Sequence, residues 1–228
     1  MVIRALIGNI ADSFGGSPAG PFSGNTSLAT SIENYYKYDG GATDSVGSND
    51  GTVSGALNSS SYGKINEGYF FDGTNDAISA NSPPDIGTGD MSINCWFYDA
   101  ATKASSEKLF WFGSSSTRAS VGPFIDNGVL KIGMYGVGLS TSTSYTAGQW
   151  NMCTIVLSGG NDVKLYLNGS PIGSDSETYD LGTDYFWVGD DTFSAWFNGN
   201  IDEVGVWSKA LSNQNALDLW NSGNGLQY

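Results

Sequence analysis

Short strand-like segments recur along most of this chain, each bounded by glycine or by a turn-forming pair of residues. NYYKYDG (34–40), MSINCWFYDA (91–100) and QWNMCTIVLS (149–158) are examples rich in aromatic and β-branched residues. These segments do not alternate with helical patterns, so parallel βαβ units are not expected. The succession predicts an all-β chain folded as a two-sheet antiparallel sandwich.

Two local signals add detail to this fold. The segment VKLYLNGSPIG predicts a hairpin, because Asn168-Gly169 supplies the positive φ angles of a two-residue type I′ turn. One short C-terminal helix is expected after Ser212, which is suited to be its N-cap. Its apolar stripe consists of Ala216, Leu217 and Trp220. The helix is expected to end at Gly223 or Gly225.

The first thirty residues differ from the rest of the chain. The stretch GGSPAGPFSGNTSLATS is rich in glycine, serine and proline, which predicts that residues 1–30 form an extended arm or linker before a sandwich domain at 31–228. Apolar residues before this stretch suggest a short docking segment, with a loosely packed terminus as the alternative. We find neither a convincing signal peptide nor a run of residues long enough to span a membrane.

Charge and residue usage exclude several classes of function. The 228 residues carry a formal net charge of −14, with only nine lysines and arginines, so neither nucleic acid nor an anionic membrane is an expected partner. The chain has no histidine, which excludes Ser-His-Asp and Cys-His catalysis and histidine-ligated zinc. Its two cysteines are too few for a structural zinc site.

An ordered set of motifs carries a resemblance to a known family. YYKYDGGATDSVGSNDGTVSG, GYFFDGTNDAISA, MSINCWFY, GQWNMCTIVLSGGNDVKLYLNGSPIG and FNGNIDEVGVWSKALS follow one another over about residues 33–222. In this order they resemble the laminin-G-like, concanavalin A-like jelly-roll domains, especially bacterial and phage modules, with pentraxins as more distant relatives. The resemblance implies two curved antiparallel sheets with ligands bound at loop tips or on a concave face.

The same resemblance suggests a disulfide. In pentraxins a disulfide joins a strand like MSINCWFY to one like WNMCTIVL, and Cys95 and Cys153 occupy the matching positions. The alternative is a pair of small buried thiols, which a reducing compartment would keep open.

The segment NIDEVGVW poses the sharpest question about function. Strand alternation predicts that Asp202 shares a face with Val204 and Val206, and that Glu203 points to the opposite face. A carboxylate beside two valines needs a partner, which could be a catalytic partner, a cation or the backbone.

A structural calcium ion is one answer. ATDSVGSNDG places Asp44, Asn49 and Asp50 in a glycine-rich loop. In laminin-G-like modules this loop often lies near the aspartate of an IDEV-like strand, which here is Asp202. Oxygen ligands of this kind suit calcium. The alternative, which we favour, is that Asp44 and Asp50 cap turns and that Asp202 accepts backbone N–H bonds.

A ligand-binding loop is expected at VGDDTFSAWFNG. Pentraxins place calcium-binding carboxylates in the comparable loop, and Asp190 and Asp191 match it loosely. Trp196 is the aromatic residue we expect to be exposed there for stacking on a sugar, and Trp111 and Tyr135 are further candidates. Three other tryptophans are expected in the core: Trp96, Trp150 and Trp207. Asp126-Asn127 could stand for a pentraxin ligand pair, but the hairpin-turn interpretation is favoured.

Catalysis is not expected. Some relatives in the superfamily hydrolyse β-glucans with a Glu-x-Asp-x-Glu strand motif, which directs its carboxylates to one face. No such motif occurs in this chain, so a glucanase is the hypothesis we rank lowest.

The leading hypothesis is a non-enzymatic binding or structural module exposed on a phage particle, as a capsid decoration, tail or fibre protein. Residues 1–30 would bind capsid or tail proteins, and the sandwich would face outward and touch host-surface glycans. The alternative is a secreted, extracellular bacterial carbohydrate-binding module. Sandwich edges can associate, so a homo-oligomer is also considered.

Overall fold

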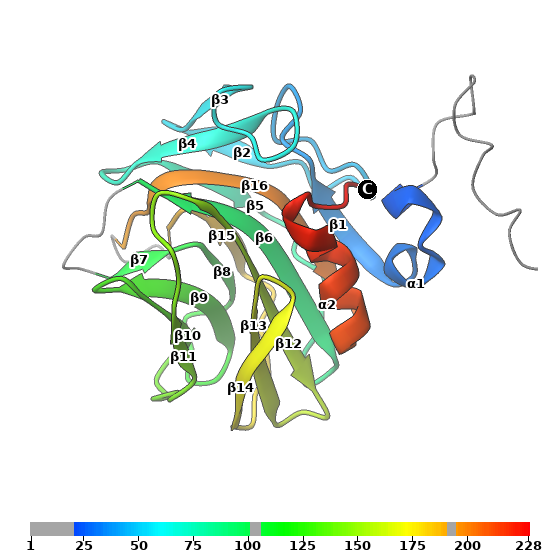
Figure 1. Cartoon of the computed structure of the whole chain (residues 1–228). Helices are drawn as coiled ribbons and strands as arrows, with labels where there is room; N and C mark the ends of the chain where they lie inside the picture. Colours follow the sequence, from blue (N-terminus) through cyan, green and yellow to red (C-terminus); the bar gives the residue numbers. More distant parts are fainter. Residues whose placement is uncertain (1–20, 101–105, 191–194) are drawn as a thin grey trace, which may run out of the picture.

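The computed structural model describes residues 21–100, 106–190 and 195–228. Within these ranges two eight-stranded antiparallel sheets pack face to face, and a helical layer covers the outer face of one of them (Figure 1). This arrangement confirms the predicted all-β sandwich with a short helix near the C-terminus.

Sheet A is the sheet covered by helices, and its strands run in the order β14-β13-β12-β6-β16-β4-β3, with β1 beside β16. Its strands are β1 (Ile32–Tyr36), β3 (Leu57–Ser59), β4 (Gly68–Asp72), β6 (Met91–Asp99), β12 (Trp150–Ser158), β13 (Asp162–Leu167), β14 (Ser170–Ser176) and β16 (Asn198–Trp207). Its centre is the pair β6 and β16. The other edge of β6 pairs with β12, and β4 and β1 pair with the other edge of β16.

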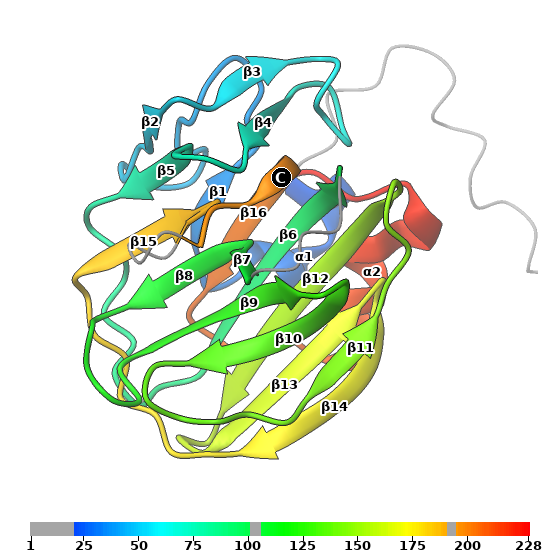
Figure 2. The same ribbon diagram turned by 90° about the vertical axis from the view of Figure 1, so that its left-hand side faces the viewer.

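Sheet B faces the viewer in Figure 2, and no described helix covers it. Its order is β11-β10-β9-β8-β15-β5-β2, with β7 beside β9. Its strands are β2 (Thr52–Ser54), β5 (Ala77–Ala80), β7 (Glu107–Lys108), β8 (Phe110–Gly113), β9 (Ser120–Asp126), β10 (Val129–Met134), β11 (Ser142–Ser144) and β15 (Tyr185–Val188).

Two apolar cores lie on the two sides of sheet A. The first fills the space between the sheets and contains Phe97 of β6, Phe110 of β8 and Val206 of β16. The second lies between sheet A and the helical layer and contains Trp96 and Trp207. Neighbouring residues of one strand, such as Trp96 and Phe97, therefore enter different cores, as the two-residue period of a strand requires.

A β-bulge in β16 overturns one prediction. Glu203 has a φ of 50°, and the register with β6 shifts between Asp202 and Gly205. Val204 and Val206 therefore belong to the core between the sheets, whereas Asp202 lies opposite Trp96 on the helix-covered face. Asp202 does not share a face with the two valines, because an extra residue in a bulge reverses the alternation.

The predicted turns are confirmed. Asn168 and Gly169, between β13 and β14, both have positive φ angles. Asn127 and Gly128, between β9 and β10, also have positive φ angles. Asp126-Asn127 is thus part of a hairpin turn, as favoured from the sequence.

The C-terminal helix α2 (Asn213–Trp220) begins at the predicted N-cap. Ser212 accepts a hydrogen bond from the backbone N–H of Asn215, whose side chain bonds back to the cap in a capping box. The helix ends at Asn221 in the left-handed region, earlier than the expected Gly223 or Gly225. In the described ranges, no helix is long and apolar enough to cross a membrane.

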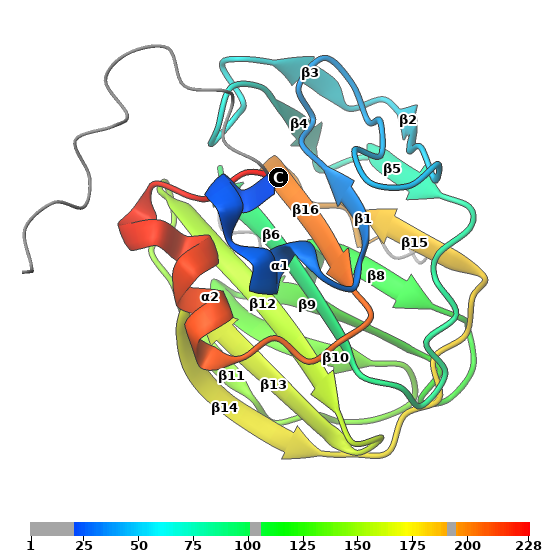
Figure 3. The ribbon, with the colours of Figure 1, turned by 90° about the vertical axis from the view of Figure 1, so that its right-hand side faces the viewer.

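Residues 21–30 correct the predicted arm. They form the short helices η1 (Pro21–Gly24) and α1 (Thr26–Ala29), which lie against sheet A beside α2 (Figure 3). Phe22 and Leu28 are buried in the second core, and the indole N–H of Trp207 donates to the backbone oxygen of Leu28 at 2.8 Å. The burial of these apolar side chains includes residues 21–30 in the domain. Residues 1–20 lie outside the described ranges.

We expect Phe22→Ala to lower the free energy of unfolding by about 3–5 kcal/mol, because the ring is buried against Tyr35, Trp207 and Tyr228. The exposed Thr26→Ala on the adjacent helix serves as control. Denaturant unfolding measures both variants. A Phe22→Ala protein as stable as the control would show that residues 21–30 do not contribute to the core.

Candidate functional site

The outer face of sheet B carries a row of aromatic side chains. Strand alternation sends Phe110, Phe112 and Phe186 into the core between the sheets. Trp111 of β8 and Trp187 of β15 therefore point outward, and the two residues lie directly opposite each other in the ladder. Tyr185, Phe124 and Trp187 are half-buried on this face. We call Lys108, Trp111, Phe124, Tyr185 and Trp187 the aromatic face.

Two glycines hold the Trp111 ring close to the sheet. A Cβ atom on Gly122 would lie 2.7 Å from the Trp111 ring, and one on Gly133 would lie 3.0 Å from it. The indole thus occupies a slot across β9 and β10 that larger residues would fill. Trp111 is only 4 % exposed, which corrects the expectation that it is an exposed aromatic. The sequence signal for this slot was a glycine inside each of the strands SVGPFID and VLKIGM.

Lys108 provides the cation of the aromatic face. Its Nζ lies 4.3 Å from the centre of the Trp111 ring and 4.1 Å from that of Phe124. These distances are within the range of cation–π contacts, which favour a cation between two rings. The contacts fix the Lys108 and Phe124 side chains relative to Trp111.

The predicted ligand-binding residues lie at one end of this face, as far as the structure describes them. Asp190 lies two residues after the end of β15 and is buried. Trp196 precedes β16 and is half-buried rather than exposed. Hydrogen bonds join the two segments, since Phe197 N–H donates to Gly189 O at 2.9 Å and Lys108 N–H donates to Ala195 O at 2.8 Å. Asp191 lies outside the described residues.

The other aromatic predictions are mixed. Trp96 and Trp207 are buried in the second core as expected, while Trp150 is only half-buried at its edge. Tyr135, just after β10, is exposed as considered.

Asp202 and Glu203 form a buried acid pair on the opposite side of the molecule. One Asp202 oxygen accepts backbone N–H bonds from Lys64 at 2.8 Å and Ile65 at 2.9 Å, and the other accepts from Glu203 N–H. Asp202 therefore attaches the loop before β4 to β16, which is the role favoured from the sequence.

Glu203 attaches the C-terminal segment. The hydroxyl of Tyr35 donates to one of its oxygens at 2.6 Å, and the side-chain amide of Gln227 donates to the other at 2.7 Å. Because of the bulge, the two carboxyl groups lie on the same side of the sheet, which corrects the expectation of opposite faces. All four oxygens accept a hydrogen bond, so the pair is arranged for structural support.

Burial makes this pair difficult to ionise. Desolvation raises the pKa of Asp202 to about 7, against the lowering effect of its three backbone N–H bonds. Desolvation and the charge of Asp202 together raise the pKa of Glu203 well above its usual value. The folded protein therefore retains a proton that the unfolded chain would release near pH 4.

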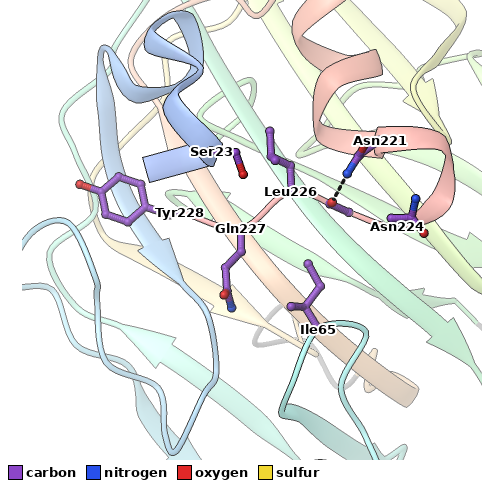
Figure 4. Close-up of a pocket in the computed structure, with 8 residues that line it drawn as sticks. Ser23, Ile65, Asn221, Asn224, Leu226, Gln227 and Tyr228 are labelled. Atoms are coloured by element: carbon purple, nitrogen blue, oxygen red, sulfur yellow. Dashed lines mark hydrogen bonds between the residues drawn. The ribbon is translucent and has the colours of Figure 1, made fainter. Parts of the chain in front are cut away.

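A polar pocket of about 400 Å³ lies outside the acid pair. Figure 4 shows Ser23, Asn221, Asn224 and Gln227 around it, with Ile65 contributed by the loop that Asp202 holds. The Asn221 side chain donates to the Gly225 backbone oxygen at 2.8 Å, which fixes the chain as it leaves the helix.

The predicted calcium ligands are not brought together as a set. Asp44 accepts from the Asn34 side chain at 2.7 Å and from backbone N–H groups that include Tyr35 and Val46, and Asp50 accepts from Asp44 N–H. Asp202 bonds elsewhere. No group of three acidic, cysteine or histidine side chains suited to a metal ion occurs among the described residues.

Asn49 bonds through its side-chain oxygen to Ser82 N–H at 3.1 Å. These bonds fit turn capping, the alternative favoured from the sequence, and the quartet does not fit a calcium ion. Hydrogen bonds to the charged form lower the pKa of Asp44, so its carboxylate is satisfied without a cation.

Cys95 and Cys153 face each other directly in the ladder between β6 and β12. Both are buried free thiols in the structure, and burial raises the pKa of each. Thiolate is therefore scarce at neutral pH, which disfavours oxidation. The disulfide stays a prediction.

Comparison with known proteins identifies the family. The family model described as "Concanavalin A-like lectin/glucanases superfamily" matches residues 72–216. The chain belongs to this superfamily. This match confirms the resemblance to concanavalin A-like jelly-roll domains that the sequence motifs indicated. No curated protein matches the chain at a significant level.

Solved structures of low sequence identity share the fold. Domain 4 of AbnA, an extracellular arabinanase from Geobacillus stearothermophilus solved with arabinotriose, has a TM-score of 0.68 at 19 % identity, over 82 % of this chain and 97 % of that domain. Trypanosoma rangeli sialidase has a TM-score of 0.68 at 12 % identity, over 85 % of this chain. The binding domain of botulinum neurotoxin serotype D has a TM-score of 0.65 at 16 % identity, over 84 % of this chain. The match spans 33 % of the sialidase chain and 52 % of the neurotoxin chain.

We expect the protein to lose stability as the pH rises from about 5 to 8. The pKa values of Asp202 and Glu203 are raised by folding, so the pair favours the folded state only while it holds its proton. Glu203→Gln should flatten this slope, since an amide can still bond Tyr35 and Gln227 and never ionises. Thermal melting at several pH values measures the dependence of stability on pH. The control is Glu177→Gln, at a partly exposed carboxylate, and an equal slope in the two variants would contradict the assignment.

Proposed function

We propose that the chain is a non-catalytic binding module that takes neutral glycans on its aromatic face. The observation that carries the proposal is the outward, half-buried pair Tyr185 and Trp187 on the sheet that no described helix covers. Aromatic rings present apolar surfaces to the faces of sugar rings, while nearby polar groups orient the hydroxyls.

The setting of the aromatic face supports binding of a neutral ligand. A protein with a formal charge of −14 repels anionic sugars at long range. Lys131 and Asp126 form an ion pair at 2.7 Å in the neighbouring hairpin, where both side chains are partly exposed and are able to bond hydroxyls. Similarity to the arabinanase domain solved with arabinotriose adds a reason to test arabinose-containing glycans first.

A binding role is favoured over hydrolysis. Hydrolysis of a glycoside needs one carboxyl group to protonate the leaving oxygen and another to attack or to activate water. Asp202 and Glu203 are almost completely buried, and each of their oxygens accepts a hydrogen bond from the protein. Their geometry supports a fixed backbone rather than acid–base chemistry.

We expect Trp187→Ala to weaken glycan binding roughly tenfold or more, because a central aromatic contact commonly carries that much affinity. Trp150→Ala is the matched control, a half-buried tryptophan on the other sheet. Glycan arrays and affinity electrophoresis in neutral polysaccharides measure binding, and melting curves check folding. Equal binding by the two variants would refute the aromatic face as the site.

The biological setting that we propose first is a phage particle, with a secreted bacterial carbohydrate-binding module as the alternative. In the phage setting, residues 1–20 bind capsid or tail proteins and the sandwich projects outward, alone or as a homo-oligomer. Deletion of residues 1–20, which keeps Phe22, should abolish copurification with capsid or tail proteins. Copurification that survives this deletion would contradict the docking role, and gel filtration of the purified chain would report an oligomer.

A further inference from the structure

A polar groove lies on the helical side of the molecule, remote from the aromatic face, and it includes the pocket beside the acid pair. Two adjoining cavities of about 400 and 430 Å³ share Ser23, Asn221 and Leu226. They are lined by residues of η1, α2 and the C-terminal segment. The helices η1 and α2 lie on the side turned to the viewer in Figure 3, whereas sheet B, which carries the aromatic face, is turned to the viewer in Figure 2. We call these two cavities together the amide groove.

Side-chain amides dominate the walls of the groove. They come from two segments that are distant in sequence, one at Asn25 and one at the C-terminal end of the chain: Gln214, Asn221, Asn224 and Gln227. The one acidic side chain in the walls is Asp218, and its oxygens accept hydrogen bonds from Asn25 at 2.8 Å and Gln214 at 2.7 Å. The groove is therefore nearly neutral in a strongly acidic protein.

Several of these amides are held in place but keep hydrogen-bonding capacity. Both bonds of the Gln227 side chain use its nitrogen, which donates to Glu203 and to Asp39, so its oxygen remains an acceptor. The exposed Asn224 side chain makes no hydrogen bond within the described part of the chain, so its donor and acceptor both face solvent.

Apolar surface completes the groove. Leu217 of α2 is 46 % exposed and lines one cavity, Ile65 lines the other, and Leu226 lines both. A ligand that suits such walls has hydroxyls that both donate and accept, apolar C–H faces and no charge, which are the properties of a neutral saccharide.

An extended peptide fits less well. A peptide that binds by strand addition needs free backbone groups on the protein. In the C-terminal segment, the oxygens of Gly225, Leu226 and Gln227 accept from Asn221, Tyr35 and Phe22.

We propose that the amide groove is a second saccharide site, specific for neutral oligosaccharides and independent of the aromatic face. The proposal goes beyond the function proposed above and does not require it, since the two sites use different residues on different layers. With both sites active, one molecule binds two glycan chains from opposite sides.

The test is a titration of the ¹⁵N-labelled protein with maltotriose, cellotriose, xylotriose and arabinotriose, followed through the side-chain amide signals of asparagine and glutamine. We expect at least one trisaccharide to shift the signals of Asn224 and Gln227 in a saturable manner. Asn224→Ala should weaken this binding roughly fivefold, the effect of about one hydrogen bond. Asn161→Ala, an exposed asparagine in the turn between β12 and β13, should change nothing.

The two proposals fail separately. Saturable shifts that persist in Trp187→Ala and weaken in Asn224→Ala support the groove whatever the fate of the aromatic face. Shifts of the groove signals that disappear in Trp187→Ala would overturn independence. The groove is also refuted if no trisaccharide shifts its amides at 10 mM, or if Asn224→Ala and Asn161→Ala bind equally.

Discussion

The packing of β16 between two apolar layers is the constraint on which the rest of the structure depends. Val204 and Val206 close the core between the sheets, while Trp207 closes the core beneath the helical layer. The strand β16 must therefore contribute apolar side chains to both cores and also carry two acidic side chains. The bulge at Glu203 makes this possible, because it sends the carboxyl groups to the helical side, where the loop before β4 and the C-terminal segment supply donors.

Local chemistry made much of this fold predictable. Asn168-Gly169 and Ser212 specify a turn and a cap through their own backbone preferences, so neighbouring sequence was sufficient. The bulge at Glu203 has no such signal, since glutamate rarely adopts a positive φ and alternation alone places Asp202 with the valines. The burial of Phe22 was also missed, because two of its three ring partners, Trp207 and Tyr228, are about two hundred residues away.

The candidate site was predicted less completely than the fold. Asp190 and Trp196 belong to segments that a backbone hydrogen bond joins at the same end of sheet B. Their role as ligand-binding residues stays a prediction. The aromatic face itself depends on which side of each strand a tryptophan occupies and on what lies beneath it. Its sequence signals were the glycines at 122 and 133, whose meaning requires knowledge that β9 and β10 pass under Trp111. Binding on this face and structural use of the buried acids are compatible, since they occupy opposite sides of the molecule.

The glycine slot beneath Trp111 has a consequence for how tightly a surface of this kind can hold a partner. A ring confined between the backbone and the Lys108 side chain has few rotamers left to lose. A mobile side chain would lose conformational entropy on association, whereas this ring has already lost it during folding. Shallow contacts on a rigid surface of this kind therefore yield more net affinity per unit of area.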